Sequence, residues 1–339
     1  MIRRLVPCVA ACLLAALPAR SEVYELPPKG FDVIGAIATV TARYDDTLVD
    51  IARHHGLGYQ DIVRANPGVG VWLPGEGTEV VLPMRFVLPP GPREGLVLNL
   101  AEYRMYYFPK PRDGEPAYVY TYPMSIGRMD WETPLGETRI VAMAKNPAWY
   151  PPQSVRDEHA TDGDPLPRVV PAGPQNPLGT RALRLGLPGY LIHGTNRPAG
   201  VGMRVSHGCI RMFPEDIEFL FQHITVNTVV RIINAPVKIG WDGEDLVAEV
   251  HPLLESPQLL VAASLQRIEK LDADIELPDV SSESKNPLTQ VTEQFITVTA
   301  ERAGQLDWGL VERLVDRSDG IPETVGTSIK NAATSAAFE

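Results

Sequence analysis

Between residues 95 and 234, turn-forming residues divide the chain into short apolar segments, and this pattern constrains the fold more than any other feature. Segments 96–100 and 103–108 are followed by a third at 117–123, beyond an Asp-Gly turn at 113–114, which is a hairpin signature. The 32 prolines of the chain favour turns and edge strands over long helices. We therefore expect a mainly β domain, a sandwich or a barrel-like sheet, at 95–234.

The same domain contains one long irregular segment and one clear helix. Residues 146–180 are dense in proline and glycine and are expected to form a loop, and a loop this long inside a domain usually shapes a site. The helix is expected at 214–222, with acidic residues in its first turn. Further strands are expected at 138–145, 182–187, 190–193 and 228–233.

Only one cysteine, Cys209, lies outside the first dozen residues, and two histidines are close to it in sequence. His193 ends an apolar strand, and His207 belongs to a Ser-His-Gly-Cys run that ends at Cys209. A thiol attacks a carbonyl as its thiolate, and a neighbouring imidazole can take the proton. Each histidine alone is more often structural, but the combination with a single thiol favours catalysis.

The glycines around these residues suit the same chemistry. The carbonyl of Gly194 can hold one ring nitrogen of His193. Gly208 allows a ligand to approach the backbone closely. The amides of Gly208 and Cys209 can point at a developing oxyanion. A metal centre is not expected, because His54 and His55 are adjacent and the remaining histidines stand alone.

Residues 1–21 have the pattern of a secretory signal peptide. A basic start is followed by an apolar run at 5–17 and by small residues at Ala19 and Ser21. The alternative is an N-terminal membrane anchor, but the run is shorter than the roughly 20 residues that span a bilayer. We expect export to the periplasm, and the net charge of −11 makes nucleic acid and anionic lipid poor partners.

Residues 37–84 have a β-α-α-β pattern. Strands are expected at 37–42 and 78–82, with a first helix capped by Asp45 or Asp46 and a second at 60–65. This order resembles the LysM module, which binds peptidoglycan. Two sequence features match as well: Asp-Thr-Leu before the first helix and Ile-Val-Arg-Ala-Asn-Pro in the second. The usual Gly-Asp-Thr-Leu is Asp-Asp-Thr-Leu here. A purely structural βααβ spacer is the alternative.

The remaining segments are less specific. Residues 84–93 are a proline-rich linker. We expect 236–325 to be an accessory region, with a hairpin at 238–251 and helices at 257–271 and 306–315. It is expected to pack on the catalytic domain and to shape the entry of an acceptor. Residues 326–339 are expected to be a disordered tail.

The catalytic motif resembles that of the L,D-transpeptidases of the YkuD type, whose signature is an upstream histidine followed by Ser/Thr-His-Gly-Cys. Here these are His193 and Ser206-His207-Gly208-Cys209, and the following Ile210-Arg211 resembles the ErfK/YbiS-like branch. The resemblance also covers residues 101–107, 170–174 and 249–252. It implies a YkuD-like β-sandwich catalytic domain.

The resemblance further implies the role of each residue. Cys209 is the nucleophile, and His193 is the general base, oriented by the carbonyl of Gly194. His207, Gly208 and Cys209 form the oxyanion hole, and Ser206 supports the loop. The substrate-binding residues are Arg204, Arg211 and Tyr190, of which the two arginines can hold carboxylates or form ordinary surface pairs. No cofactor is implied.

The implied donor is a peptidoglycan tetrapeptide stem, attacked at the L,D bond before its terminal D-Ala. The acceptor stays open between the lysine of an outer-membrane lipoprotein or other envelope protein and the diamino acid of a second stem, which gives a 3–3 crosslink. Water as acceptor would make the enzyme an L,D-carboxypeptidase or a hydrolase. A non-catalytic wall-binding protein is the alternative from another class.

Overall fold

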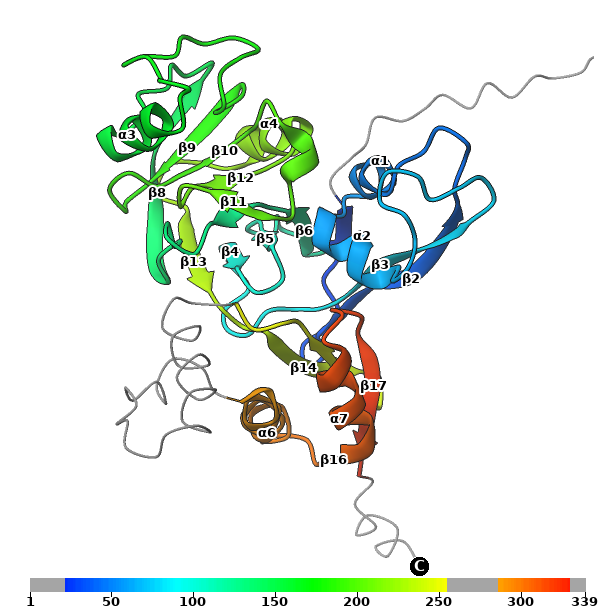
Figure 1. Ribbon diagram of the computed structural model, residues 1–339. Coiled ribbons are helices and arrows are strands. Elements are labelled where there is room, and N and C mark those ends of the chain that lie inside the picture. The colour runs from blue at the N-terminus through cyan, green and yellow to red at the C-terminus, as the bar shows by residue number, and fades with distance from the viewer. Residues whose placement is uncertain (1–21, 255–285, 330–339) are drawn as a thin grey trace, which may run out of the picture.

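The computed structural model describes residues 22–254 and 286–329 (Figure 1). The predicted signal peptide, the predicted helix at 257–271 and the end of the predicted tail lie outside the described residues. None of the helices in the described ranges has the length and apolar character needed to cross a membrane.

The largest element is a mixed sheet of nine strands. Two neighbouring pairs are parallel, β4 with β13 and β10 with β12, and the other neighbours are antiparallel. In sheet order the strands are β1 (Glu22–Glu25), β6 (Tyr118–Pro123), β5 (Arg104–Phe108), β4 (Gly95–Asn99), β13 (Val229–Ile233), β8 (Gly136–Lys145), β9 (Arg181–Leu185), β10 (Leu191–His193) and β12 (Ile210–Arg211).

This sheet curls so that its two ends share one hydrophobic core. Tyr122, from one end, belongs to the same buried cluster as Ile192 and Ile210, from the other. The ends also meet through the backbone, because Ser125, just after β6, donates to the carbonyl of Arg211 at 2.8 Å and accepts from its amide at 3.2 Å. The expected mainly β fold is confirmed, and its sandwich-like core is enclosed by a single curled sheet.

Two helices belong to this domain. The expected helix is α4 (Pro214–His223), which packs Ile217 and Leu220 into the core. The expected loop at 146–180 is partly wrong, because it contains a second helix, α3 (Gln153–Thr161), which has one buried apolar residue, Val155. So little apolar periodicity gives the helix almost no signal in the sequence.

The βααβ order expected at 37–84 is present, with longer strands. The elements are β2 (Val33–Thr41), α1 (Leu48–His54), α2 (Tyr59–Ala65) and β3 (Glu79–Val87). Residues 84–87, expected in the linker, therefore continue β3. The cap of α1 is Thr47, whose hydroxyl accepts from the amide of Asp50 at 3.0 Å, rather than Asp45 or Asp46.

The C-terminal region is a separate four-stranded sheet in the order β14 (Val237–Asp242), β15 (Asp245–Val250), β17 (Glu323–Ser328) and β16 (Gly304–Leu306). The helices α6 (Pro287–Val298) and α7 (Trp308–Arg317) contribute to its core. The expected hairpin at 238–251 is thus present as β14 and β15. The predicted disorder is wrong for residues 326–328, which pair within β17.

A buried ionic cluster joins the three parts. Lys238 of β14 is 1% exposed, and its ammonium contacts Glu102 at 2.6 Å and Glu249 at 2.8 Å. It also donates to the carbonyl of Val87, at the end of β3, at 2.7 Å. The C-terminal sheet is therefore fixed to both the curled sheet and the βααβ unit, which both lie above it in Figure 1.

Candidate active site

The sequence-predicted base and nucleophile lie on two adjacent parallel strands. His193 is the last residue of β10, and Cys209 immediately precedes β12. The register pairs Ile192 with Ile210 and His193 with Arg211. The chain from 194 to 208 connects these strands, so residues distant in sequence line one cavity, as the spacing predicted.

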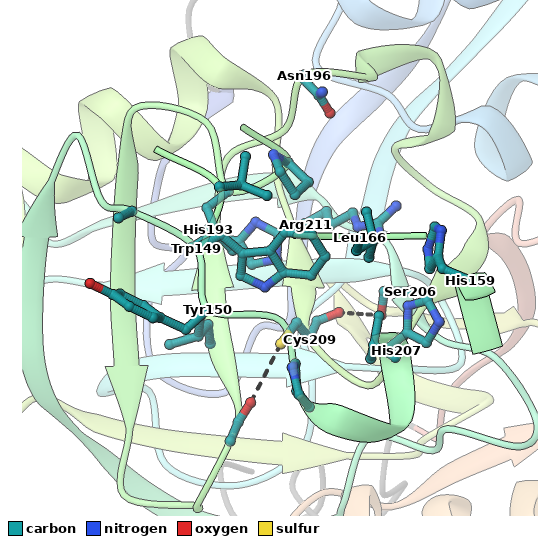
Figure 2. Close-up of a pocket in the computed structure, with 18 of the residues that line it drawn as sticks. Trp149, Tyr150, His159, Leu166, His193, Asn196, Ser206, His207, Cys209 and Arg211 are labelled. Carbon is teal, nitrogen blue, oxygen red and sulfur yellow. Dashed lines mark hydrogen bonds between the residues drawn. The ribbon is translucent and has the colours of Figure 1, made fainter. Parts of the chain in front are cut away.

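Cys209 is partly buried and lines this cavity (Figure 2). Its sulfur lies 3.7 Å from the carbonyl oxygen of Gly189. Burial raises the pKa of the thiol, against smaller lowering effects from the backbone of Leu191 and the charge of Arg211. The resting residue is therefore a neutral thiol at neutral pH.

His193 is buried, with 3% exposure, and one ring nitrogen is already fixed. Its Nδ1 lies 2.6 Å from the carbonyl oxygen of Gly194, an arrangement in which Nδ1 carries the proton and donates. Burial and, second, the charge of Arg211 lower the pKa of His193 to about 3. The imidazole is therefore neutral, with Nε2 as its free acceptor.

His207 is held by the helix that the sequence did not predict. Its Nε2 lies 2.9 Å from a carboxylate oxygen of Glu158 on α3, and Arg128 donates to the other oxygen at 2.7 Å. The ring also packs edge-on against Trp131, at 5.1 Å between centroids. Burial lowers the pKa of His207 more than Glu158 raises it. Glu158 thus fixes α3 to the Ser-His-Gly-Cys run.

The run itself has a constrained backbone. Gly208 has φ +91°, and a Cβ atom there would lie 2.8 Å from the ring of Tyr190. Its carbonyl accepts from the Thr133 hydroxyl at 2.9 Å. The buried Ser206 hydroxyl donates to the carbonyl of Cys209 at 2.5 Å. These contacts hold the peptide groups beside the thiol in one conformation.

The cavity has a volume of about 510 Å³. One wall comes from the 146–180 segment, including Trp149, Tyr150 and Leu166, which Figure 2 shows around the thiol and His193. The expectation that this segment shapes a site is confirmed. Among the described residues, none from the C-terminal region lines the cavity, so the expectation that this region shapes acceptor entry finds no support there.

Three arginines, Arg184, Arg197 and Arg211, line the cavity and give it a positive character. Arg211 and Arg197 both line it, and the charge of Arg197 is one of the causes that lower the pKa of Arg211, after burial. The Arg211 Nε is buried without a hydrogen-bond partner among the described residues. In the part of the chain that the structure describes, no carboxylate lies within ion-pair distance of the guanidinium of Arg197 or of Arg211. An anionic ligand would supply the missing partner.

The other two predicted substrate-binding residues lie just outside the cavity lining. Arg204 of β11 (Arg204–Ser206) donates to the carbonyl of Gly127 at 3.0 Å and lies 3.5 Å from Glu132. The Tyr190 hydroxyl donates to the backbone of Glu132 at 3.3 Å. Both side chains therefore support the wall of the site in the structure.

Sequence reasoning missed Arg197 and Glu158. Arg197 had a usable signal, because it lies between the two motif halves, whereas the role of Glu158 depends on the fold of a segment without periodicity.

Away from the cavity, Glu102, Glu249 and His251 converge with metal-ligand atom types. The Lys238 ammonium already contacts both carboxylates, which makes this cluster an ion-pair network.

Comparisons with known proteins identify the family of the chain. The L,D-transpeptidase catalytic domain family YkuD matches residues 93–232. The chain is 40% identical to the probable L,D-transpeptidase YcfS of Escherichia coli, over 74% of this chain and 81% of that protein. It is 36% identical to the probable L,D-transpeptidase ErfK/SrfK of Salmonella typhimurium, over 89% of this chain and 90% of that protein. L,D-transpeptidase 3 from Mycobacterium tuberculosis aligns structurally at 19% identity, over 46% of this chain and 67% of that chain, with a TM-score of 0.31.

The extent of the match to these relatives shows that the chain belongs to the L,D-transpeptidase family. It is an enzyme of the acyltransferase class.

Proposed function

We propose that the chain is a periplasmic L,D-transpeptidase that acts on peptidoglycan through a Cys209 acyl-enzyme. The observation that carries the proposal is the convergence of Cys209 and the buried, neutral His193 in one cavity. The donor is a tetrapeptide stem, and the bond attacked is the L,D amide before the terminal D-Ala. Export rests on the signal-like sequence of residues 1–21.

The proposed first half-reaction forms a thioester. The Cys209 sulfur attacks the carbonyl carbon while its proton moves to Nε2 of His193. Because the thiol pKa is raised and the His193 pKa is lowered, a thiolate–imidazolium pair is unfavourable in the empty site. Proton transfer is therefore coupled to formation of the carbon–sulfur bond.

The tetrahedral intermediate then collapses. Its oxyanion is stabilised by amides of His207, Gly208 and Cys209, whose backbone is fixed by the contacts of Ser206 and Thr133. The carbon–nitrogen bond breaks, and D-Ala leaves with the proton from His193. An acceptor amine next attacks the thioester, gives a proton to His193, and releases Cys209 as the thiol.

Stem carboxylates provide the anionic partner that Arg211 and Arg197 lack. Their binding would also counter the positive charge that lowers the pKa of His193, making the base stronger when substrate is present. The acceptor is an amine, either a lysine of an envelope protein or the diamino acid of a second stem.

We further propose that the βααβ unit binds the glycan in the manner of a LysM module and raises the local concentration of stems. Two of its loops carry exposed aromatic residues, Tyr44 with 75% and Trp72 with 66% exposure. A hydrogen bond of 2.9 Å from the Leu48 amide to the carbonyl of Val71 joins the two loops. Exposed apolar side chains grouped in this way are typical of ligand-binding surfaces.

Mass spectrometry of reaction products tests the catalytic proposal. The protein and its Cys209→Ala variant are incubated with diaminopimelate tetrapeptide fragments, with and without a lysine-terminated peptide. Loss of D-Ala together with a new amide bond, only when Cys209 is present, is the expected result, and the product identifies the acceptor. Loss of D-Ala with addition of water would indicate the carboxypeptidase, and no product would favour a wall-binding protein.

A further inference from the structure

The βααβ unit is docked directly on the loop that connects the base to the nucleophile. This loop, residues 196–203, includes the short 3₁₀ turn Pro198–Gly200 and contributes Asn196 and Arg197 to the cavity. At the start of α2, the Tyr59 amide donates to the carbonyl of Val201 at 2.9 Å. The Gln60 amide donates to the next carbonyl of the loop at 3.4 Å.

The two backbones touch without intervening side chains. A Cβ atom on Gly58 would lie 2.8 Å from the Cα of Gly202, and one on Gly202 would lie 2.4 Å from the amide nitrogen of Tyr59. Both neighbouring atoms belong to the backbone and cannot rotate away. Gly202 also has φ +85°, which disfavours a side chain independently. The contact therefore requires glycine on both surfaces.

Two ion pairs also hold the unit against the catalytic domain. Arg53 of α1 forms a bidentate pair with Glu215 in the first turn of α4, at 2.7 and 2.8 Å. Asp61 of α2 accepts from Arg104 of β5 at 2.6 Å, and Arg104 is 1% exposed. In Figure 1 the unit accordingly lies beside β6 and α4. Such anchoring leaves the unit little freedom to move separately from the loop.

We propose that the βααβ unit positions the 196–203 loop, and with it Arg197, for binding of the anionic donor stem. Gly58 contacts the loop, Gly202 belongs to it, and Arg53 fixes the unit to α4. None of the three lines the cavity, so they are positioning residues. The inference rests on the proposed function for the identity of the ligand. It assigns the unit a second task, because a module that only tethers the enzyme to the wall would not affect a soluble substrate.

The experiment measures the charge that Arg197 contributes to the cavity that contains the thiol. Cys209 of the whole chain is alkylated with iodoacetate, which is anionic, and with iodoacetamide, which is neutral, and the ratio of the two rate constants is compared between variants. Arg197→Gln is expected to lower the ratio about fivefold, through loss of one nearby charge. Gly202→Ala is expected to lower it similarly, and to have no further effect in the Arg197→Gln background.

A charge-reversal pair gives a second, independent arm. Arg53→Glu is expected to lower the ratio, and adding Glu215→Arg is expected to restore it. Arg43→Glu, which reverses an exposed charge on the same unit, is the matched control and is expected to leave the ratio unchanged. If neither Gly202→Ala nor Arg53→Glu alters the ratio while Arg197→Gln does, the proposal is wrong. Additive effects of Gly202→Ala and Arg197→Gln would also overturn it.

Turnover of a soluble tetrapeptide, which contains no glycan, separates this inference from the proposed function. In Gly202→Ala and Arg53→Glu, the fold-increase in KM is expected to be about five times the fold-decrease in kcat. The reason is that loss of one charge contact weakens binding of the substrate in its ground state. Absence of turnover by the unsubstituted protein would refute the proposed function, and the alkylation ratios would still decide the inference.

Discussion

His193 and Arg211 are register partners across the parallel strands β10 and β12, so the imidazole has a partly buried cation as its cross-strand neighbour. Arg211 is, after burial, the main cause of the lowered pKa of His193. The same arginine lines the cavity that contains the thiol, and its buried Nε has no hydrogen-bond partner within the described residues. Under the proposed function, this pairing couples binding of an anionic stem to the strength of His193 as a base.

Replacing Arg211 is expected to change both properties. In Arg211→Gln the pKa of His193 should rise from about 3, because a like charge that disfavours protonation is removed. KM for a stem peptide should rise about tenfold with loss of a charge-assisted hydrogen bond. NMR titration of the imidazole and steady-state kinetics measure the two effects. Arg184→Gln, at another cavity arginine, is the control, and an unchanged His193 titration in Arg211→Gln would contradict the coupling.

The thiol is expected to titrate at high pH. Because burial raises the pKa of Cys209, its thiolate should form above the pH at which a free cysteine ionises, about 8.5. The rate of alkylation by iodoacetamide should therefore reach half its maximum at higher pH in the folded protein than in a peptide containing Ser-His-Gly-Cys. A lower midpoint in the folded protein would instead show a preformed thiolate and would refute the coupled proton transfer.

Glu158 is expected to hold α3 over the site through its charge. In Glu158→Gln the pKa of His207 should fall, because a carboxylate that favours the imidazolium is lost, and Arg128 loses an ion-pair partner. Amide hydrogen exchange in α3 should become faster by up to about fivefold, as expected for loss of one solvent-screened ionic contact. Asp157→Asn, which changes the adjacent carboxylate, should leave exchange near its original rate. Equal exchange in both variants would show that Glu158 does not hold the helix.

Lys238 is expected to be essential for stability. Lys238→Met leaves Glu102 and Glu249 buried without their shared cation, and removal of one partner of a buried ion pair costs about 3–5 kcal/mol. Urea denaturation should show this loss in the free energy of unfolding. Lys110→Met, at an exposed lysine, should change the stability by less than about 0.5 kcal/mol. A similar small change for Lys238→Met would mean that the cluster does not join the three parts.

Local patterns were sufficient for much of the fold. The strands at 96–100, 103–108 and 117–123 were predictable because apolar runs and an Asp-Gly turn act over a few residues. The βααβ order was predictable for the same reason. The helix α3 was not, because it buries only Val155 and derives its position from contacts made by Glu158 with residues far away in the chain.

The sequence by itself determined the chemistry of this protein: a single thiol outside the signal-like segment, two histidines near it, and glycines that leave the backbone accessible. These are properties of residue type and short spacing. Only the tertiary structure decided the charge environment of the site. Strand pairing places Arg211 beside His193, and Arg197 belongs to a loop whose backbone contacts the start of α2. Protonation depends on burial and on charges brought close in space, and no local pattern records which distant side chains will meet.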